Sequence, residues 1–146
     1  RSTSLGAVEW FIDAPTGMNG SAPWTDEEKA AVQAAVHTYK TKMRPLVRNA
    51  DLYHILPRPD GKNWDGIQYY DPAANKGAVY LFKPSAVADT ITIKLRGVEA
   101  KTTYRVTFED GSNPAREKTG EELASGLAVT LKGAPLSELV FVEAVR

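Results

Sequence analysis

The 146-residue sequence contains no cysteine, only two histidines and no excess of either charge. The lack of cysteine excludes disulfides, thiolate nucleophiles and the usual structural zinc sites. A protein that binds nucleic acid needs a basic face to neutralise phosphates, and here 18 basic residues balance 18 acidic ones. No apolar run is long enough to cross a bilayer. We therefore expect a soluble globular protein with neither nucleic acid nor a membrane as a partner.

Motifs of the common catalytic and cofactor sites are also missing. His37 and His54 have no carboxylate at metal-ligand spacing on a shared helix, so we expect no metal and no cofactor. No serine stands in a Gly-x-Ser-x-Gly elbow, and with two histidines and no cysteine the sequence has few residues from which a nucleophile triad could be built. A phosphate loop at Lys118 is rejected because Glu117 stands where the preceding glycine should be.

The N-terminal part of the sequence predicts a strand, a loop and one helix. The apolar run from Leu5 to Ile12 is typical of a buried strand that leaves into a loop at Asp13. Thr25 and Glu28 form a capping-box pattern that starts a helix, and Pro45 predicts that this helix ends or kinks at Arg44-Pro45. The apolar stripe of the helix consists of Val32, Val36, Tyr39 and Met43.

From Leu52 onwards the hydrophobic period changes to two, which predicts strands. One-sided alternation is clearest in Thr90 to Arg96 and is typical of antiparallel sheets with a wetted outer face. We expect a mainly β fold, an antiparallel β-sandwich of about seven to eight strands, with a helical turn at Gly120 to Leu123. The predicted strands are 52–56, 64–70, 78–82, 90–96, 103–109, 127–132 and 139–145.

Two groups of residues are candidates for a carbohydrate site. Glu9 and Asp13 could act as acid and base in glycoside hydrolysis, but Asp13 already falls in the loop and we assign no catalytic residue. Sugar rings stack on aromatic faces while polar groups pair with their hydroxyls. A cluster that combines both kinds of group contains Trp64, Asp65, Tyr69 and Tyr70. The alternative, packing in the core or between domains, is favoured over sugar contact.

Motifs spread over nearly the whole chain resemble the C-terminal region of melibiase-like α-galactosidases. In that family the last strand and helix of a (β/α)8 catalytic barrel lead into a C-terminal β-sandwich. The motifs are Leu5 to Trp10, Thr25 to Glu28, His37 to Lys40, Met43 to Val47, Asn63-Trp64, Gln68-Tyr69, Leu95 to Val98 and Tyr104 to Val106.

The resemblance implies a division of the chain at residue 50. Residues 1–50 would be the terminal strand, loop and helix of a catalytic barrel, and residues 51–146 the β-sandwich domain. The family's nucleophile and acid/base aspartates lie on earlier barrel strands, which this chain does not contain, so the chain alone is predicted to be inactive. Barrel active sites lie at the carboxyl ends of the strands. This makes Trp10, Asp13 and Trp24 candidates for the barrel rim.

Three functions follow as hypotheses. The first is a non-catalytic C-terminal portion of an α-galactosidase-like glycoside hydrolase that stabilises the barrel. The second is a carbohydrate-binding module, and the third is a structural or self-association domain that hides its apolar helix stripe. The expected partners are a carbohydrate and either the missing barrel of the parent chain or a second copy. A secreted or periplasmic location is favoured over the cytoplasm.

Overall fold

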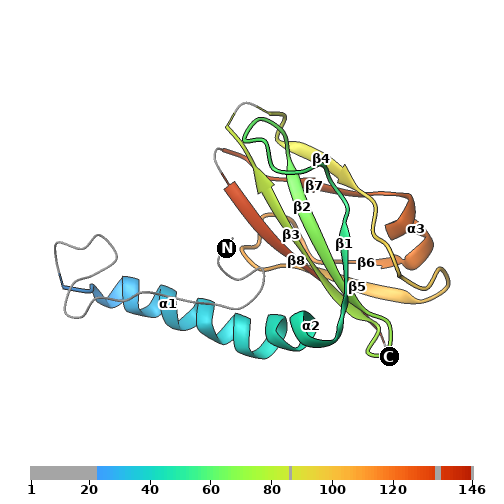
Figure 1. The fold of residues 1–146 in the computed structure, drawn as a ribbon, viewed down its shortest axis with the longest axis horizontal. Coiled ribbons are helices and arrows are strands. Elements are labelled where there is room, and N and C mark those ends of the chain that lie inside the picture. The colour runs from blue at the N-terminus through green and yellow to red at the C-terminus, as the bar shows by residue number, and fades with distance from the viewer. Residues whose placement is uncertain (1–22, 86, 134–135, 146) are drawn as a thin grey trace. The chain divides into compact units, whose positions relative to one another are not determined.

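The computed structural model describes residues 23–85, 87–133 and 136–145. The chain divides into two compact units, Arg1–Arg48 and Asn49–Arg146. The first unit holds a long helical segment, and the second holds the described strands and one short helix (Figure 1). Among the described residues, no helix is both long and apolar enough to cross a membrane.

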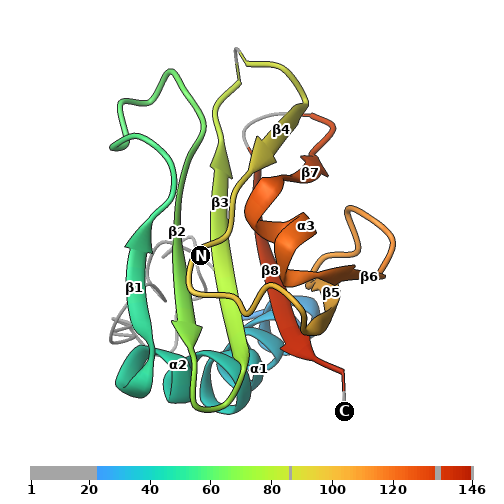
Figure 2. The same ribbon diagram turned by 90° about the vertical axis from the view of Figure 1, so that its right-hand side faces the viewer.

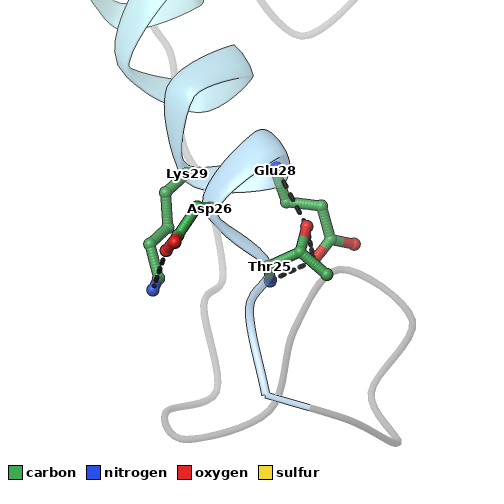
Figure 3. Close-up of polar contacts among 4 residues, drawn as sticks. All are labelled: Thr25, Asp26, Glu28 and Lys29. Atoms are coloured by element: carbon green, nitrogen blue, oxygen red, sulfur yellow. Dashed lines mark hydrogen bonds and ion pairs between the residues drawn. The ribbon is translucent and has the colours of Figure 1, made fainter.

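The helical segment begins with the predicted capping box. Helix α1 spans Asp26–Thr38. The Glu28 amide donates to Thr25 Oγ1 at 3.1 Å, and the Thr25 amide donates to Glu28 Oε2 at 2.9 Å (Figure 3). Lys29 Nζ lies 2.9 Å from Asp26 Oδ1 in the same turn. Two amides that would lack partners are thereby satisfied, which stabilises the helix by about 1 kcal/mol.

Of the two predicted outcomes, an end or a kink of the helix at Arg44-Pro45, the first does not occur, because the helical segment continues through Pro45. A π-helical turn, η2 (Tyr39–Met43), follows α1 and leads directly into α2 (Arg44–Asn49). The Arg44 amide donates to the carbonyl of Tyr39, five residues back. Proline lacks an N–H and its ring crowds the carbonyl four residues earlier. A π turn is wider than an α-helical turn and leaves more room for the proline ring. The disturbance expected at Pro45 is therefore a local widening of the helix before it.

The second unit is an antiparallel two-layer β-sandwich, as predicted. The strands are β1 (Asp51–His54), β2 (Asp65–Asp71), β3 (Lys76–Lys83), β4 (Thr90–Ile93), β5 (Thr103–Phe108), β6 (Arg116–Thr119), β7 (Leu127–Thr130) and β8 (Leu136–Ala144). Six of them form one sheet in the order β1-β2-β3-β8-β5-β6, and β4 pairs with β7. The small sheet and helix α3 (Gly120–Ser125) lie on one side of the large sheet (Figures 1 and 2).

Strand β6 is the element that the sequence did not predict. Its four residues, Arg116 to Thr119, show no alternation of apolar and polar side chains, so no strand pattern is visible in the sequence. They form a short edge strand that pairs only with β5 among the described strands. Such an edge is specified by its neighbour rather than by its own pattern. The helical turn expected after it is confirmed as α3, which begins with a second capping box between Thr119 and Glu122.

The hydrophobic core lies between the two sheets. Tyr104 and Val106 on β5 are fully buried while Arg105 between them is exposed, which confirms the alternation predicted for this strand. Buried residues of β4, β7 and α3 complete the core from the other side. Its fully buried members include Val79, Tyr104, Val106, Leu123, Val129, Val140 and Val142.

Candidate functional site

The barrel-rim candidates contribute little to a described site. Trp10 and Asp13, together with Glu9, lie outside the described residues. Trp24 is described and half-buried, directly before the N-cap residue Thr25. A rim role for these residues therefore stays a prediction.

Trp64 and Tyr70 face the core between the sheets. Trp64 is only 8% exposed, and its indole Nε1 donates to the carbonyl of Ala88 at 3.0 Å. Tyr70 is 1% exposed and belongs to the same core cluster. A sugar ring needs an open aromatic face, so the burial of both rings favours the packing alternative for these residues.

The Tyr70 hydroxyl belongs to a chain of hydrogen bonds inside the sandwich. It lies 2.7 Å from the Tyr104 hydroxyl and donates to Asn75 Oδ1 at 3.0 Å. The Glu99 amide donates to the Tyr104 hydroxyl at 3.0 Å. Burial, followed by the hydrogen bond with Tyr104, raises the pKa of Tyr70 above its ordinary value. The chain connects β2, β5, the β2–β3 turn and the loop before β5, and it has no sequence signal beyond two well-placed tyrosines.

Asp65 and Tyr69 lie on the opposite face of β2, because side chains alternate along a strand. Asp65 is half-buried, and its pKa is raised, first by burial and then by the negative charge of Asp60. The pKa of Asp60 itself is lowered by hydrogen bonds from the Lys62 amide and from Asn63. The four carbohydrate candidates are thus divided between two faces and do not form one cluster.

Neither the histidines nor the hollow at the β2–β3 turn forms a recognisable site. His37 and His54 are exposed on α1 and β1, and no group of three or more potential metal ligands occurs among the described residues. An open hollow of about 440 Å³ lies at the β2–β3 turn. It has no aromatic lining residue that could receive a sugar ring. Its lining consists of Ala73, Ala74, Asn75, Lys76, Glu143 and Ala144.

The most unusual feature is that the centre of the large sheet, formed by β2, β3 and β8, is apolar on both faces. Five consecutive residues of β3, Gly77 to Leu81, are buried, and so are Leu139 to Val142 on β8. The pairing of Ile67 with Tyr80, and of Tyr80 with Leu139, places these side chains on the face opposite the core. We call this surface the outer patch. It consists of Ile67, Tyr69, Ala78, Tyr80, Phe82, Leu139 and Phe141.

The outer patch ends where the sheet continues into β5 and β6. Arg105 and Glu117 are exposed on this part of the face, and Thr107 is half-buried. The alternation predicted for β4 and β5 therefore does not extend to β2, β3 and β8. The expectation of an outer face in contact with water was wrong for those three strands. Their side chains are apolar on both faces, which is typical of a sheet that is covered on both faces.

Comparisons with known proteins agree on the fold. No protein-family model and no curated protein matches the sequence. Among solved structures, the GH36 α-galactosidase AgaB from Geobacillus stearothermophilus is 23% identical with a TM-score of 0.70, and the match covers 84% of this chain and 16% of that one. A variant of AgaA from the same organism, bound to raffinose, is 23% identical with a TM-score of 0.68 and the same coverage.

A third structure, the α-galactosidase from Lactobacillus brevis, is 19% identical with a TM-score of 0.68, over 84% of this chain and 17% of that one. This chain thus spans about one sixth of the length of these enzymes. The resemblance predicted from the sequence is confirmed at the level of the fold. The chain has the fold of a segment of GH36 α-galactosidases, consistent with their C-terminal β-sandwich domain.

Proposed function

We propose that this chain is the C-terminal, non-catalytic portion of an α-galactosidase-like glycoside hydrolase, and that its β-sandwich stabilises the catalytic barrel of the complete enzyme. The observation that carries this proposal is the outer patch, a second apolar face on a sheet that already has a core on its other side. Within the proposal, residues 1–50 are the terminal strand, loop and helix of the barrel, and residues 51–146 are the sandwich.

The energetics favour a covering layer for the outer patch. Tyr69, Tyr80, Leu139 and Phe141 are each less than 10% exposed. Burying one large apolar side chain contributes about 1.5 to 3 kcal/mol. Four such residues therefore contribute about 10 kcal/mol as an upper estimate, similar to the entire stability of a domain. Side chains buried this deeply behave as a second core, which supports a permanent layer within one enzyme rather than a transient ligand.

Nothing in the described part of the chain supplies a catalytic pair. We infer that the nucleophile and the acid/base belong to barrel segments outside residues 1–146. Alone, this chain should hydrolyse no aryl α-galactoside, and a rate comparable to that of ordinary enzymes would contradict the proposal.

The test of the stabilising role uses the complete enzyme, expressed from the reading frame that contains this chain. Phe141→Asp places a charge in the outer patch. We expect the enzyme to lose activity at a lower temperature, with an unchanged KM for an aryl α-galactoside. Thr92→Asp adds the same charge on the exposed side of β4 and is the matched control. Equal inactivation temperatures for Phe141→Asp and the control would refute the proposed contact.

A further inference from the structure

We propose that the two glutamates of β8, Glu138 and Glu143, determine the register of this strand in the large sheet. Glu138 points toward the core side of the sheet, and Glu143 points toward the outer side. Because they lie five positions apart in an alternating strand, each one secures a different face. The inference concerns the sheet itself and does not depend on the proposed enzyme.

The apolar pattern alone leaves this register weakly specified. A one-residue slip turns every side chain to the other face, which is costly only when the two faces differ. β3 and β8 are apolar on both faces, so a slip would still bury apolar groups. No tight turn holds the pairing either, because β3 ends at Lys83 and β8 begins at Leu136. Polar side chains must therefore supply the specificity.

Glu138 supplies it on the core side. It is 0% exposed and lies opposite Leu81 of β3. Its Oε1 accepts hydrogen bonds from the Leu139 amide at 2.8 Å and from the Asp110 amide, just beyond β5, at 3.2 Å. A slip of β8 relative to β5 would separate Glu138 from Asp110. A buried acceptor that loses its donor is strongly disfavoured.

Glu143 supplies specificity on the outer side. It lies opposite Lys76 of β3 and opposite Arg105 of β5. These residues belong to a row of alternating charge that crosses five adjacent strands in register. The row consists of Asp71, Lys76, Glu143, Arg105 and Glu117. Opposite charges directly across from each other stabilise a sheet, and like charges destabilise it. Any shift of β8 breaks this row at its centre.

The register also decides the composition of the outer patch. A one-residue slip would replace Leu139 and Phe141 on that face with Val140 and Val142. The same slip would bring Glu138 into an apolar surface and turn Glu143 toward the core. The two glutamates thus keep the outer patch uncharged.

Cross-strand disulfides can report the register directly, because the chain has no cysteine of its own. Phe82→Cys with Ser137→Cys joins residues that lie opposite each other in the observed register. Phe82→Cys with Leu136→Cys can close only after a one-residue slip. The full chain carrying each pair is refolded in a glutathione redox buffer, and the two cross-linking yields are compared.

Glu143→Lys is the decisive change, since it sets three positive charges in a row. We expect the share of slipped cross-link to rise about ten-fold. The five-fold variant Asp71→Asn, Lys76→Glu, Glu143→Lys, Arg105→Glu, Glu117→Lys leaves no like charges opposite each other and keeps an acceptor for the Ala73 and Ala74 amides at position 71, so it should return the share to its original value. Glu117→Lys makes the same charge change in the same row on β6, away from β8, and should leave the β3–β8 register unchanged.

Two outcomes would overturn the proposal. One is a Glu143→Lys chain that keeps the original ratio of cross-links. The other is a five-fold variant that does not restore that ratio, and this criterion holds even if Glu143→Lys alone fails to fold. On the core side, Glu138→Leu should also raise the slipped share, because it removes the acceptor for the Asp110 amide.

Discussion

The hydrogen-bond chain through Tyr104 and Tyr70 allows a quantitative prediction about two apparently equivalent hydroxyls. The Glu99 amide donates to Tyr104, and Tyr70 donates to Asn75 Oδ1. A single direction of donation then follows, in which the Tyr104 hydroxyl donates to the Tyr70 hydroxyl over 2.7 Å. In such an aligned chain each bond polarises the next and strengthens it.

Removing the two hydroxyls should have unequal costs. After Tyr70→Phe, the Tyr104 hydroxyl can turn toward Asn75 Oδ1, which lies 3.5 Å away, so one bond is partly recovered. After Tyr104→Phe, the Glu99 amide loses the acceptor that it has in this structure. A typical hydrogen bond contributes about 1 kcal/mol, and an unsatisfied donor costs about 1 to 3 kcal/mol. We expect losses of about 1 kcal/mol for Tyr70→Phe and about 2 to 3 kcal/mol for Tyr104→Phe.

Urea unfolding followed by tryptophan fluorescence, to which the buried Trp64 contributes, measures both losses. Tyr53→Phe is the matched control, because its hydroxyl makes a long, exposed contact of 3.4 Å with Asp51 and should cost less than 0.5 kcal/mol as a rough limit. The double variant of Tyr70 and Tyr104 should cost less than the sum of the single losses. A loss for Tyr70→Phe that equals or exceeds that for Tyr104→Phe would refute the assigned direction of the chain.

Glycine packing, the titration of Tyr70 and sugar binding each provide a further test. Gly120→Ala should lower the free energy of unfolding by at least about 3 kcal/mol, because the added Cβ would overlap the Glu99 carbonyl. Gly111→Ala is the control, because Gly111 has a φ of +67° and open space around it, and it should lower the free energy of unfolding by only about 1 kcal/mol. Equal losses for the two variants would contradict this packing. The raised pKa of Tyr70 means that its contribution to stability is complete below the ordinary tyrosine value of 10.0 and is lost as the pH rises above it, so melting temperatures between about pH 9 and 11 should fall less steeply in Tyr70→Phe. Calorimetry with galactosides at millimolar concentrations should show no heat of binding, whereas heat that disappears in a folded Trp64→Ala variant would favour the carbohydrate-binding alternative.

Local features of this chain could be predicted from the sequence because they depend on neighbouring residues. The capping box of Thr25 and Glu28 involves residues of a single helical turn. The alternation of apolar and polar side chains along β5 shows which face of that strand is exposed to water. The resemblance to α-galactosidases likewise came from motifs, and the fold confirms it. The aromatic cluster was the exception, because adjacent residues such as Tyr69 and Tyr70 point to opposite faces of a strand.

The tertiary structure alone decided features that depend on distant partners. β6 exists because β5 offers its edge, and the outer patch exists because β2, β3 and β8 are neighbours although β8 lies far along the chain. A sequence shows whether a strand is apolar on both faces, but not which strands lie beside it. The pairing of Glu143 with Lys76 and Arg105 joins residues remote in sequence, and only the assembled sheet brings their charges into one row.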